Sequence, residues 1–187
     1  MKVDMLWKFK LPKVMQGGYM EESKFCSESL VVKTSIVFPT DTNTYGTLFG
    51  GKLMAYIDDT AAISAMRHAR RGIVTASTDS VDFLYPIHEG NAVCLEAFVT
   101  YTGSSSMEVF VKVTAEDLIS GERHLCALSF LTMVAIDEHG KPTKVPKVIP
   151  QTEEEKSLYE SAKERAEARK KRKKETEELA KKYRSLG

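Results

Sequence analysis

Five segments of the chain combine apolar and β-branched residues in the way that is typical of β-strands. They cover residues 30–38, 73–84, 92–102, 107–116 and 123–136. The connections between the last four are short enough for antiparallel turns. In the fourth segment every second residue from Met107 to Val113 is apolar, which predicts one buried face and one partly buried face. The fifth segment is apolar almost throughout, which predicts a central strand covered on both faces.

One long helix is predicted between the first two strands. After a pair of glycines, apolar residues recur with the i, i+3, i+4 spacing of one buried helix face. These residues are Leu53, Met54, Ile57, Ala61 and Ala65. Basic residues and Gly72 then mark the end of a helix that covers about residues 51–69. The order of strand, long helix and four antiparallel strands predicts an α+β domain in which the helix covers one sheet.

The two ends of the chain differ from this core domain, which covers residues 29–150. Residues 1–28 have no sustained hydrophobic period, and we expect them to form a poorly ordered extension. Translation from Met20 instead of Met1 is a hypothesis, because the preceding residues can be encoded by a purine-rich stretch that resembles a bacterial ribosome-binding site. Residues 151–187 hold twelve Lys and Arg and nine Glu, with Glu-to-Lys pairs four apart that predict a solvated helical tail.

Composition narrows the class of protein. The 187 residues, 42% of them apolar, suffice for one core, and the net charge of +1 gives no overall attraction to nucleic acid. The basic run 169–174 fits a solvated helix better than an RNA-binding or membrane-binding one. No apolar run matches a signal peptide or a membrane span, so we expect a cytoplasmic protein without membrane insertion. The scattered Cys26, Cys94 and Cys126 and the unpaired histidines predict neither a disulfide framework nor a metal site.

The glycine pair at the predicted helix start allows several interpretations. Gly46, followed by Gly51-Lys52, matches a P-loop except that Leu53 replaces the hydroxyl residue, and the preceding segment is a polar turn instead of a buried strand. A second interpretation is an oxyanion hole, because the first N–H groups of a helix have no partner within the helix and glycine lets a substrate oxygen approach them. A third is that Gly50 and Gly51 only allow tight packing against the sheet.

Two polar side chains near these glycines are candidates for chemistry. Asp58 lies inside the helix among small apolar neighbours, where aspartate is a poor helix former. It is either a functional carboxylate or a solvent-facing residue, and Asp59 fits the second description at least as well. Asn43 lies in the polar turn, where ordinary turn chemistry also explains it.

The segment 41–58 closely resembles the acyl-CoA thioesterases of the hotdog superfamily, in the group that contains bacterial acyl-CoA hydrolases and the vertebrate brain-type cytosolic acyl-CoA hydrolase. The shared features are Asn43, Gly46, Phe49-Gly50-Gly51, Ile57-Asp58 with the alanine-rich helix that follows, residues 80–87 and residues 103–106. The resemblance covers about residues 30–148. It implies the hotdog fold, in which an antiparallel sheet of about five strands wraps the long central helix and two protomers join their sheets edge to edge.

The resemblance also implies roles for individual residues. Asp58 would be the acidic catalytic residue, and Asn43 of the other protomer would be its partner at the thioester. Gly50 and Gly51 would supply backbone donors to the oxyanion. The residues expected to hold CoA are Gly103, Ser104, Ser105, Ser106, Arg70 and Arg71. No cofactor is expected apart from the CoA of substrate and product, and the dimers would assemble into hexamers as trimers of dimers.

The activity implied in this way is the hydrolysis of fatty acyl-CoA to fatty acid and CoA. Asp58 would act as a general base or as a nucleophile, two roles that the sequence does not separate. The same fold also serves dehydratases and acyl-CoA-sensing regulators. A dehydratase needs a histidine near the helix start, whereas His68 is at the far end, and a regulator needs a DNA-binding module, for which the sequence has no helix-turn-helix pattern. The sequence determines neither the preferred acyl chain length nor whether the protein is a dimer or a hexamer.

Overall fold

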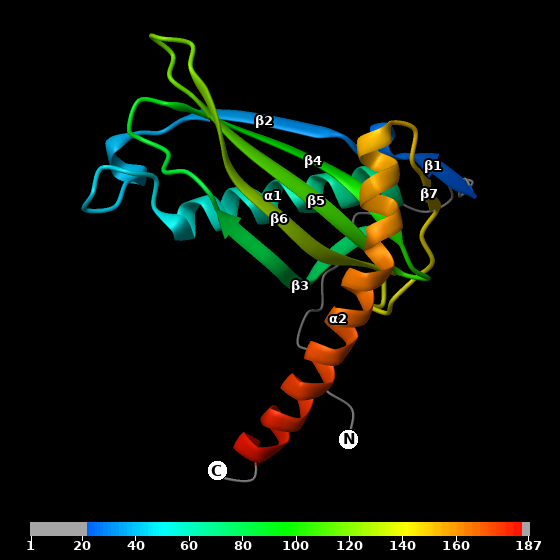
Figure 1. Cartoon of the computed structure of the whole chain (residues 1–187). Coiled ribbons are helices and arrows are strands. Elements are labelled where there is room, and N and C mark those ends of the chain that lie inside the picture. Colours follow the sequence, from blue (N-terminus) through cyan, green and yellow to red (C-terminus); the bar gives the residue numbers. More distant parts are fainter. Residues whose placement is uncertain (1–21, 185–187) are drawn as a thin grey trace. The chain divides into compact units, whose positions relative to one another are not determined.

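The computed structural model describes residues 22–184, and its central feature is a five-stranded antiparallel sheet (Figure 1). The strands lie in the order β2-β4-β5-β6-β3, so β2 and β3 form its edges. Their bounds are β2 Val31–Ile36, β3 Gly72–Phe83, β4 Ala92–Thr102, β5 Ser106–Glu116 and β6 Arg123–Ile136. Each predicted strand is therefore confirmed within two residues of its expected limits.

The long helix α1 (Gly50–Ala69) lies along one face of the sheet and contacts all five strands (Figure 1). Leu53, Ile57 and Ala61, one or two helical turns apart, are at most 3% exposed and form the buried face against the sheet. Met54 belongs to the same apolar pattern but is 49% exposed, so its expected burial is wrong in the isolated chain. The predicted arrangement of one helix covering one antiparallel sheet is confirmed.

Strand β6 is an inner strand, as predicted, but it is not covered equally on both faces. It pairs with β5 on one side and β3 on the other. Leu131 and Met133 are at most 1% exposed, whereas Phe130 and Val134, which alternate with them, are only half-buried. The apolar run therefore reflects the inner position of the strand, because one of its faces keeps partial contact with solvent.

The segment before β2 forms more structure than its composition predicts. Strand β1 (Ser23–Phe25) pairs in parallel with β7 (Lys147–Ile149), and the 3-10 helix η2 (Cys26–Ser29) follows. Cys26 and Ser29 are fully buried, and the Val99 N–H donates to the Ser29 hydroxyl over 2.9 Å. The expectation of a poorly ordered extension is therefore wrong for residues 23–28. Three-residue strands and single turns are too short to show a hydrophobic period.

The remaining residues of the expected extension, numbers 1–21, lie outside the described residues. The hypothesis of a start at Met20 falls on them and stays a hypothesis.

The charged tail belongs to a second compact unit, which begins at Pro150. It contains the helix α2 (Glu153–Arg184), whose start is a capping box: the Glu155 N–H donates to the Thr152 hydroxyl, and the Thr152 N–H donates to the Glu155 carboxylate. Ion pairs on its surface join Lys156 to Glu153 and Lys173 to Glu177. Neither α2 nor any other helix in the described range is long and apolar enough to cross a membrane.

Candidate active site

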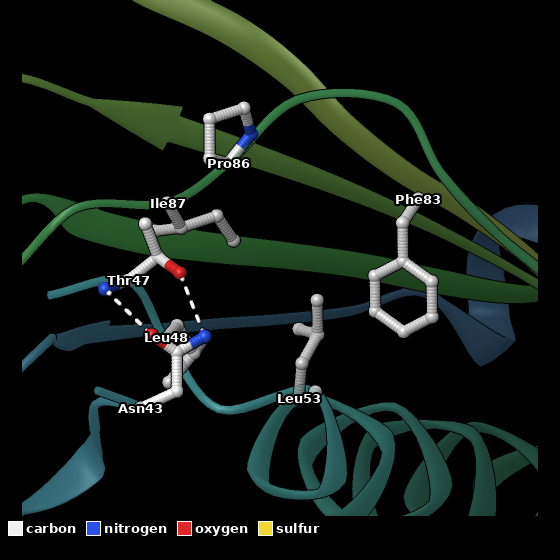
Figure 2. A pocket seen from close by; sticks show the side chains of 8 residues that line it. Asn43, Thr47, Leu48, Leu53, Phe83, Pro86 and Ile87 are labelled. Atoms are coloured by element: carbon white, nitrogen blue, oxygen red, sulfur yellow. Dashed lines mark hydrogen bonds between the residues drawn. The ribbon is translucent and has the colours of Figure 1, made fainter. Parts of the chain in front are cut away.

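Asn43 organises the turn that precedes α1. Its side-chain oxygen accepts hydrogen bonds from the backbone N–H groups of Tyr45, at 2.9 Å, and Thr47, at 3.3 Å. Its side-chain Nδ2 donates to the Thr47 hydroxyl at 2.9 Å (Figure 2). The Asn43 N–H also donates to the Thr47 carbonyl at 2.8 Å. Asn43 is thus a turn-forming residue, as its position predicts, and the same bonds fix the orientation of its amide.

The start of α1 presents two unpaired backbone donors. Within residues 22–184 the N–H groups of Gly50 and Gly51 have no hydrogen-bond acceptor, and Phe49 at the N-cap supplies no side-chain cap. No acidic side chain lies within the first turn of α1, and the nearby Asp41 carboxylate pairs with Lys52, so the positive end of the helix dipole remains available to an anion. These N–H groups could therefore bind a developing negative charge on a substrate oxygen.

The two glycines differ in how much space surrounds them. Neither has a positive φ angle, so backbone conformation does not demand glycine at either position. A Cβ on Gly51 would lie 2.5 Å from the Phe49 ring, whereas a Cβ on Gly50 would lie 3.8 Å from Phe83, which is ordinary contact. Tight packing therefore accounts for Gly51 but not for Gly50, which leaves room at the helix start.

An apolar cavity of about 290 Å³ opens beside this helix start (Figure 2). Its lining residues are Asn43, Thr47, Leu48, Gly50, Leu53, Phe83, Pro86 and Ile87. Asn43 and Gly50 thus lie on the wall of one cavity, with aliphatic and aromatic side chains around them. Such a combination is typical of a site for a largely apolar ligand with a polar reacting group.

Asp58 and Asp59 face different neighbours. The Thr75 hydroxyl on β3 donates to the Asp58 carboxylate at 2.8 Å, whereas Asp59 pairs with Lys33 on β2 at 3.4 Å. Asp58 and Thr75 are both exposed in the isolated chain. Thr75 lies next to an irregularity of β3, because the pairing register with β6 shifts between Thr75 and Ser77. Such bulges re-aim side chains, often beside functional sites.

Sequence analysis missed Thr75. The sequence shows only a polar residue within a predicted strand, and its cross-strand neighbour in the structure, Met133, is fully buried. The contact between Thr75 and Asp58 depends on how the strand lies against the helix, which the sequence does not give.

The residues expected to bind CoA gather at the other end of the fold. Gly72 pairs with Ile136 and Ser106 pairs with Val134, both at the end of β6. Arg70 and the loop 103–106 therefore lie at the same end of the sheet. Arg70 itself caps the helix with a left-handed conformation, φ 51°. Asp58 is about 12 Å along the helix axis from Gly50, and Arg70 about 18 Å further, at 1.5 Å per residue. One chain therefore does not bring all the candidate residues together.

The serine loop has a backbone conformation held from several sides. The Gly103 N–H donates to the Ser106 carbonyl, while the Ser104 and Ser105 carbonyls accept from Val145 and Ala135. A Cβ on Gly103 would lie 2.6 Å from the Ser106 hydroxyl oxygen, so a larger residue there would require the Ser106 side chain to move. Ser104 is exposed and can contact a ligand.

The P-loop interpretation of the segment finds no support in the structure. Lys52 lies in the first turn of α1 and pairs with Asp41 at 3.2 Å, and the hydrogen bond and charge of Asp41 raise the Lys52 pKa. The preceding residues form the 3-10 helix η3 (Pro39–Asp41) and not a buried strand, so the P-loop interpretation is wrong. Within the described range no cluster of His, Cys, Asp and Glu could hold a metal ion.

The chain is similar to known acyl-CoA hydrolases. Residues 45–121 match the thioesterase superfamily. The chain is 62% identical over 159 residues to an uncharacterized acyl-CoA thioester hydrolase of Bacillus subtilis, YkhA, which covers 85% of this chain and 92% of that protein. It is 37% identical over 130 residues to the cytosolic acyl coenzyme A thioester hydrolase of Rattus norvegicus, covering 68% of this chain but only 34% of the rat protein.

Solved structures have the same fold. A hexameric acyl-CoA thioesterase, in its apo form, matches with a TM-score of 0.80 at 56% identity, covering 81% of this chain and 97% of the other. The acyl-CoA hydrolase of Staphylococcus aureus, in complex with butyryl coenzyme A and coenzyme A, matches with a TM-score of 0.82 at 49% identity, covering 85% and 97%. Variants of the same enzyme have an aspartate, an asparagine or a threonine replaced by alanine.

Proposed function

The chain belongs to the acyl-CoA thioester hydrolases of the thioesterase superfamily, and on that basis we propose that it hydrolyses fatty acyl-CoA to free fatty acid and CoA. The observation that carries the proposal is the similarity to acyl-CoA hydrolases along most of the chain, up to 62% identity over 92% of a relative's length. The apolar cavity beside unpaired helix N–H groups supports the same chemistry.

The spacing of three residues supports their assignment to the reaction. In the Staphylococcus aureus enzyme the substituted asparagine precedes the substituted aspartate by 15 positions, and the substituted threonine follows that aspartate by 17. Asn43, Asp58 and Thr75 have the same two spacings in this chain. We therefore assign Asp58 and Asn43 as catalytic residues and Thr75, through its hydrogen bond to Asp58, as the residue that orients the carboxylate.

The reaction requires one carboxylate and one oxyanion site. The Asp58 carboxylate takes a proton from water, and the hydroxide attacks the thioester carbonyl carbon; alternatively, the carboxylate attacks first and forms a mixed anhydride that water then cleaves. The carbonyl oxygen becomes an oxyanion, which the N–H groups of Asn43, Gly50 and Gly51 stabilise, at up to about 3 kcal/mol for each donor. The carbon–sulfur bond then breaks, and CoA leaves as a thiolate.

The site is shared between two protomers in this proposal. Gly50 begins α1 about 12 Å along the helix axis from Asp58, and Asn43 lies in the turn before it, so the partner's helix has to supply the missing carboxylate. A second copy would also cover apolar side chains that one chain leaves exposed. These are Met54, Met66, Val74 and Phe83, between 41% and 56% exposed. A homodimer is therefore the minimal active unit, and a trimer of such dimers would give a hexamer like that of the related thioesterase.

The acyl chain, the pantetheine arm and the phosphates of the substrate can each be assigned to a part of the structure. The apolar cavity would receive the acyl chain, since its wall carries the oxyanion donors. The loop of Gly103, Ser104, Ser105 and Ser106 would hold the pantetheine arm, and Arg70 and Arg71 the phosphates. No cofactor takes part beyond the CoA that enters with the substrate. We also propose a cytoplasmic location, as for the rat relative named as cytosolic.

A panel of acyl-CoA substrates from C2 to C18 tests the proposed activity. The purified chain should release free CoA thiol, detected with a chromogenic thiol reagent, and mass spectrometry should find the matching fatty acid. The profile of kcat/KM would also give the chain-length preference. Absence of thiol release with every member of the panel, from a folded oligomer, would contradict the proposal.

A further inference from the structure

We propose that Thr47 is a positioning residue for the reaction, acting through Asn43 by holding its side-chain amide in the orientation that donates to the substrate. The inference rests on the proposed hydrolysis and on the role of Asn43 in it. Thr47 lies four residues after Asn43 at the end of the same turn and lines the same cavity (Figure 2).

The side-chain amide of Asn43 can accept two hydrogen bonds and donate two. Its Oδ1 accepts from two backbone N–H groups, at 2.9 and 3.3 Å, so both acceptor positions of the oxygen are occupied. Its Nδ2 donates one of two protons to the Thr47 hydroxyl at 2.9 Å. One N–H remains. Asn43 can therefore act on the substrate as a single donor to the carbonyl oxygen, and not as an acceptor that holds the attacking water.

The direction of that remaining N–H depends on Thr47. The two protons of a side-chain amide lie in one plane with fixed angles, so anchoring one of them also sets the direction of the other. The terminal torsion of asparagine is soft, with broad minima. The two backbone donors hold the oxygen end, and the Thr47 hydroxyl is what holds the nitrogen end. Without that acceptor the nitrogen end is no longer held, so the amide can tilt about its anchored oxygen and the remaining N–H loses part of its aim at the oxyanion.

An ordinary structural role for Thr47 predicts different behaviour. Thr47 also ties the turn through its backbone, since its carbonyl accepts from the Asn43 N–H and its own N–H donates to Asn43 Oδ1. Those bonds persist whatever side chain stands at position 47. Substitutions that change only the hydroxyl therefore separate aiming of the amide from formation of the turn.

Thr47→Val is the main test, because valine keeps the branched shape and removes the acceptor. We expect kcat for acyl-CoA hydrolysis to fall on the order of 10-fold with KM changed less than twofold, since misaimed groups reduce the rate of the chemical step. Thr47→Ser, which restores a hydroxyl, should recover most of the lost rate. Thr44→Val makes the same change at an exposed threonine in the same turn and should leave the rate unchanged.

Coupling to Asn43 decides whether the effect passes through its amide. Asn43→Ala should lower kcat, and adding Thr47→Val to Asn43→Ala should lower it no further. In NMR spectra of the wild type, hydrogen bonding should shift the resonance of one of the two Asn43 Nδ2 protons downfield. This shift should be lost in Thr47→Val. This second readout does not depend on activity.

The outcomes separate the two proposals. Independent, multiplicative losses from Thr47→Val and Asn43→Ala, or an unchanged Asn43 amide signal in Thr47→Val, would overturn the positioning role. Full activity of Thr47→Val beside an impaired Asn43→Ala would do the same and leave the function intact. Absence of hydrolysis by the wild type would overturn the proposed function instead. Should Thr47→Val fail to fold, Thr47→Ala replaces it in the same assays.

Discussion

Two adjacent aspartates on α1 differ in their partners, and this difference carries the first prediction. Asp58→Asn should lower kcat about 10³-fold or more, because an amide cannot take a proton from water. The new amide oxygen can still accept from the Thr75 hydroxyl, so the local geometry should persist. The kcat of Asp59→Asn should stay within about twofold of the wild-type value, because this substitution weakens only an exposed ion pair with Lys33.

Steady-state kinetics on the preferred acyl-CoA, with CoA binding by calorimetry as a check of folding, would measure both variants. If Asp59 were the essential residue of the two, the assignment of catalytic roles would be wrong by one position.

At the same scale, Asp58 and Thr75 illustrate what a sequence can and cannot reveal. Asp58 was a candidate because a carboxylate stands inside a helix among small apolar residues, and the family resemblance gave it a role. Thr75 was not a candidate, because its hydroxyl reaches Asp58 across 17 positions of chain. That contact requires the relative position of β3 and α1, including the register shift beside Thr75. No local pattern encodes either.

At the scale of the helix, Gly50 offers a substitution that separates folding from catalysis. Gly50→Ala should keep or raise the stability of α1, since alanine is the better helix former, by about 1 kcal/mol in a helix interior and by less at this first helical position. The new methyl group would make an ordinary 3.8 Å contact with Phe83. It would also enter the cavity beside the unpaired N–H groups, so we expect kcat/KM to fall at least about tenfold through restricted approach of the substrate oxygen.

Thermal denaturation and kinetics on the same preparation would test this expectation. A variant with full activity would show that the space at Gly50 is not used by the substrate.

The elements that the sequence predicted well are those with many periods of a pattern. The helix 51–69 and the strands of the main sheet repeat their apolar positions often enough for both type and limits to be recognised. Strands β1 and β7 have three residues each, and their pairing joins residues more than 120 positions apart. The exposure of Met54 could not be predicted from one chain either, because its helical spacing assigns it to the apolar face whether the neighbour is its own sheet or a second protomer.

At the scale of the whole fold, His68 links α1 to the segment before β7. It is fully buried, and its Nε2 is 3.0 Å from the carbonyl oxygen of Pro146. Burial lowers the His68 pKa below its usual 6.5, helped by the nearby Lys24, although the Pro146 carbonyl and Glu28 oppose this. The imidazole is therefore neutral in the folded chain at neutral pH.

A pH dependence of stability follows from that depressed pKa. Below about pH 6.5 the unfolded chain binds a proton at this site before the folded chain does. The free energy of unfolding should therefore fall as pH decreases from 6.5, by at most about 1.4 kcal/mol per pH unit from this group, and be independent of His68 above pH 7.5. Urea unfolding of wild type and His68→Gln between pH 5 and 8 would compare the slopes. Equal slopes would contradict the prediction.

The shared site makes the strongest prediction about the assembled molecule. In a twofold dimer each of two equivalent sites would take Asn43 from one chain and Asp58 from the other. Asn43→Ala and Asp58→Ala chains should each have strongly reduced activity as homodimers. In a mixed dimer one site carries both substitutions and the other carries neither, so activity should return. Random exchange makes about half of the dimers mixed, which gives about one quarter of the wild-type rate.

Co-expression of differently tagged chains, followed by two affinity steps, would isolate the mixed species. That species should then have about half of the wild-type kcat per dimer, because one of its two sites is complete. A matched dimer of Asn43→Ala and wild-type chains controls for the tags and should also keep one complete site. An inactive but verified heterodimer would mean that one subunit supplies both residues to its own site. Because Asn43 lies in the turn before α1 and Asp58 lies two helical turns inside it, such a result would also require α1 or that turn to rearrange when substrate binds.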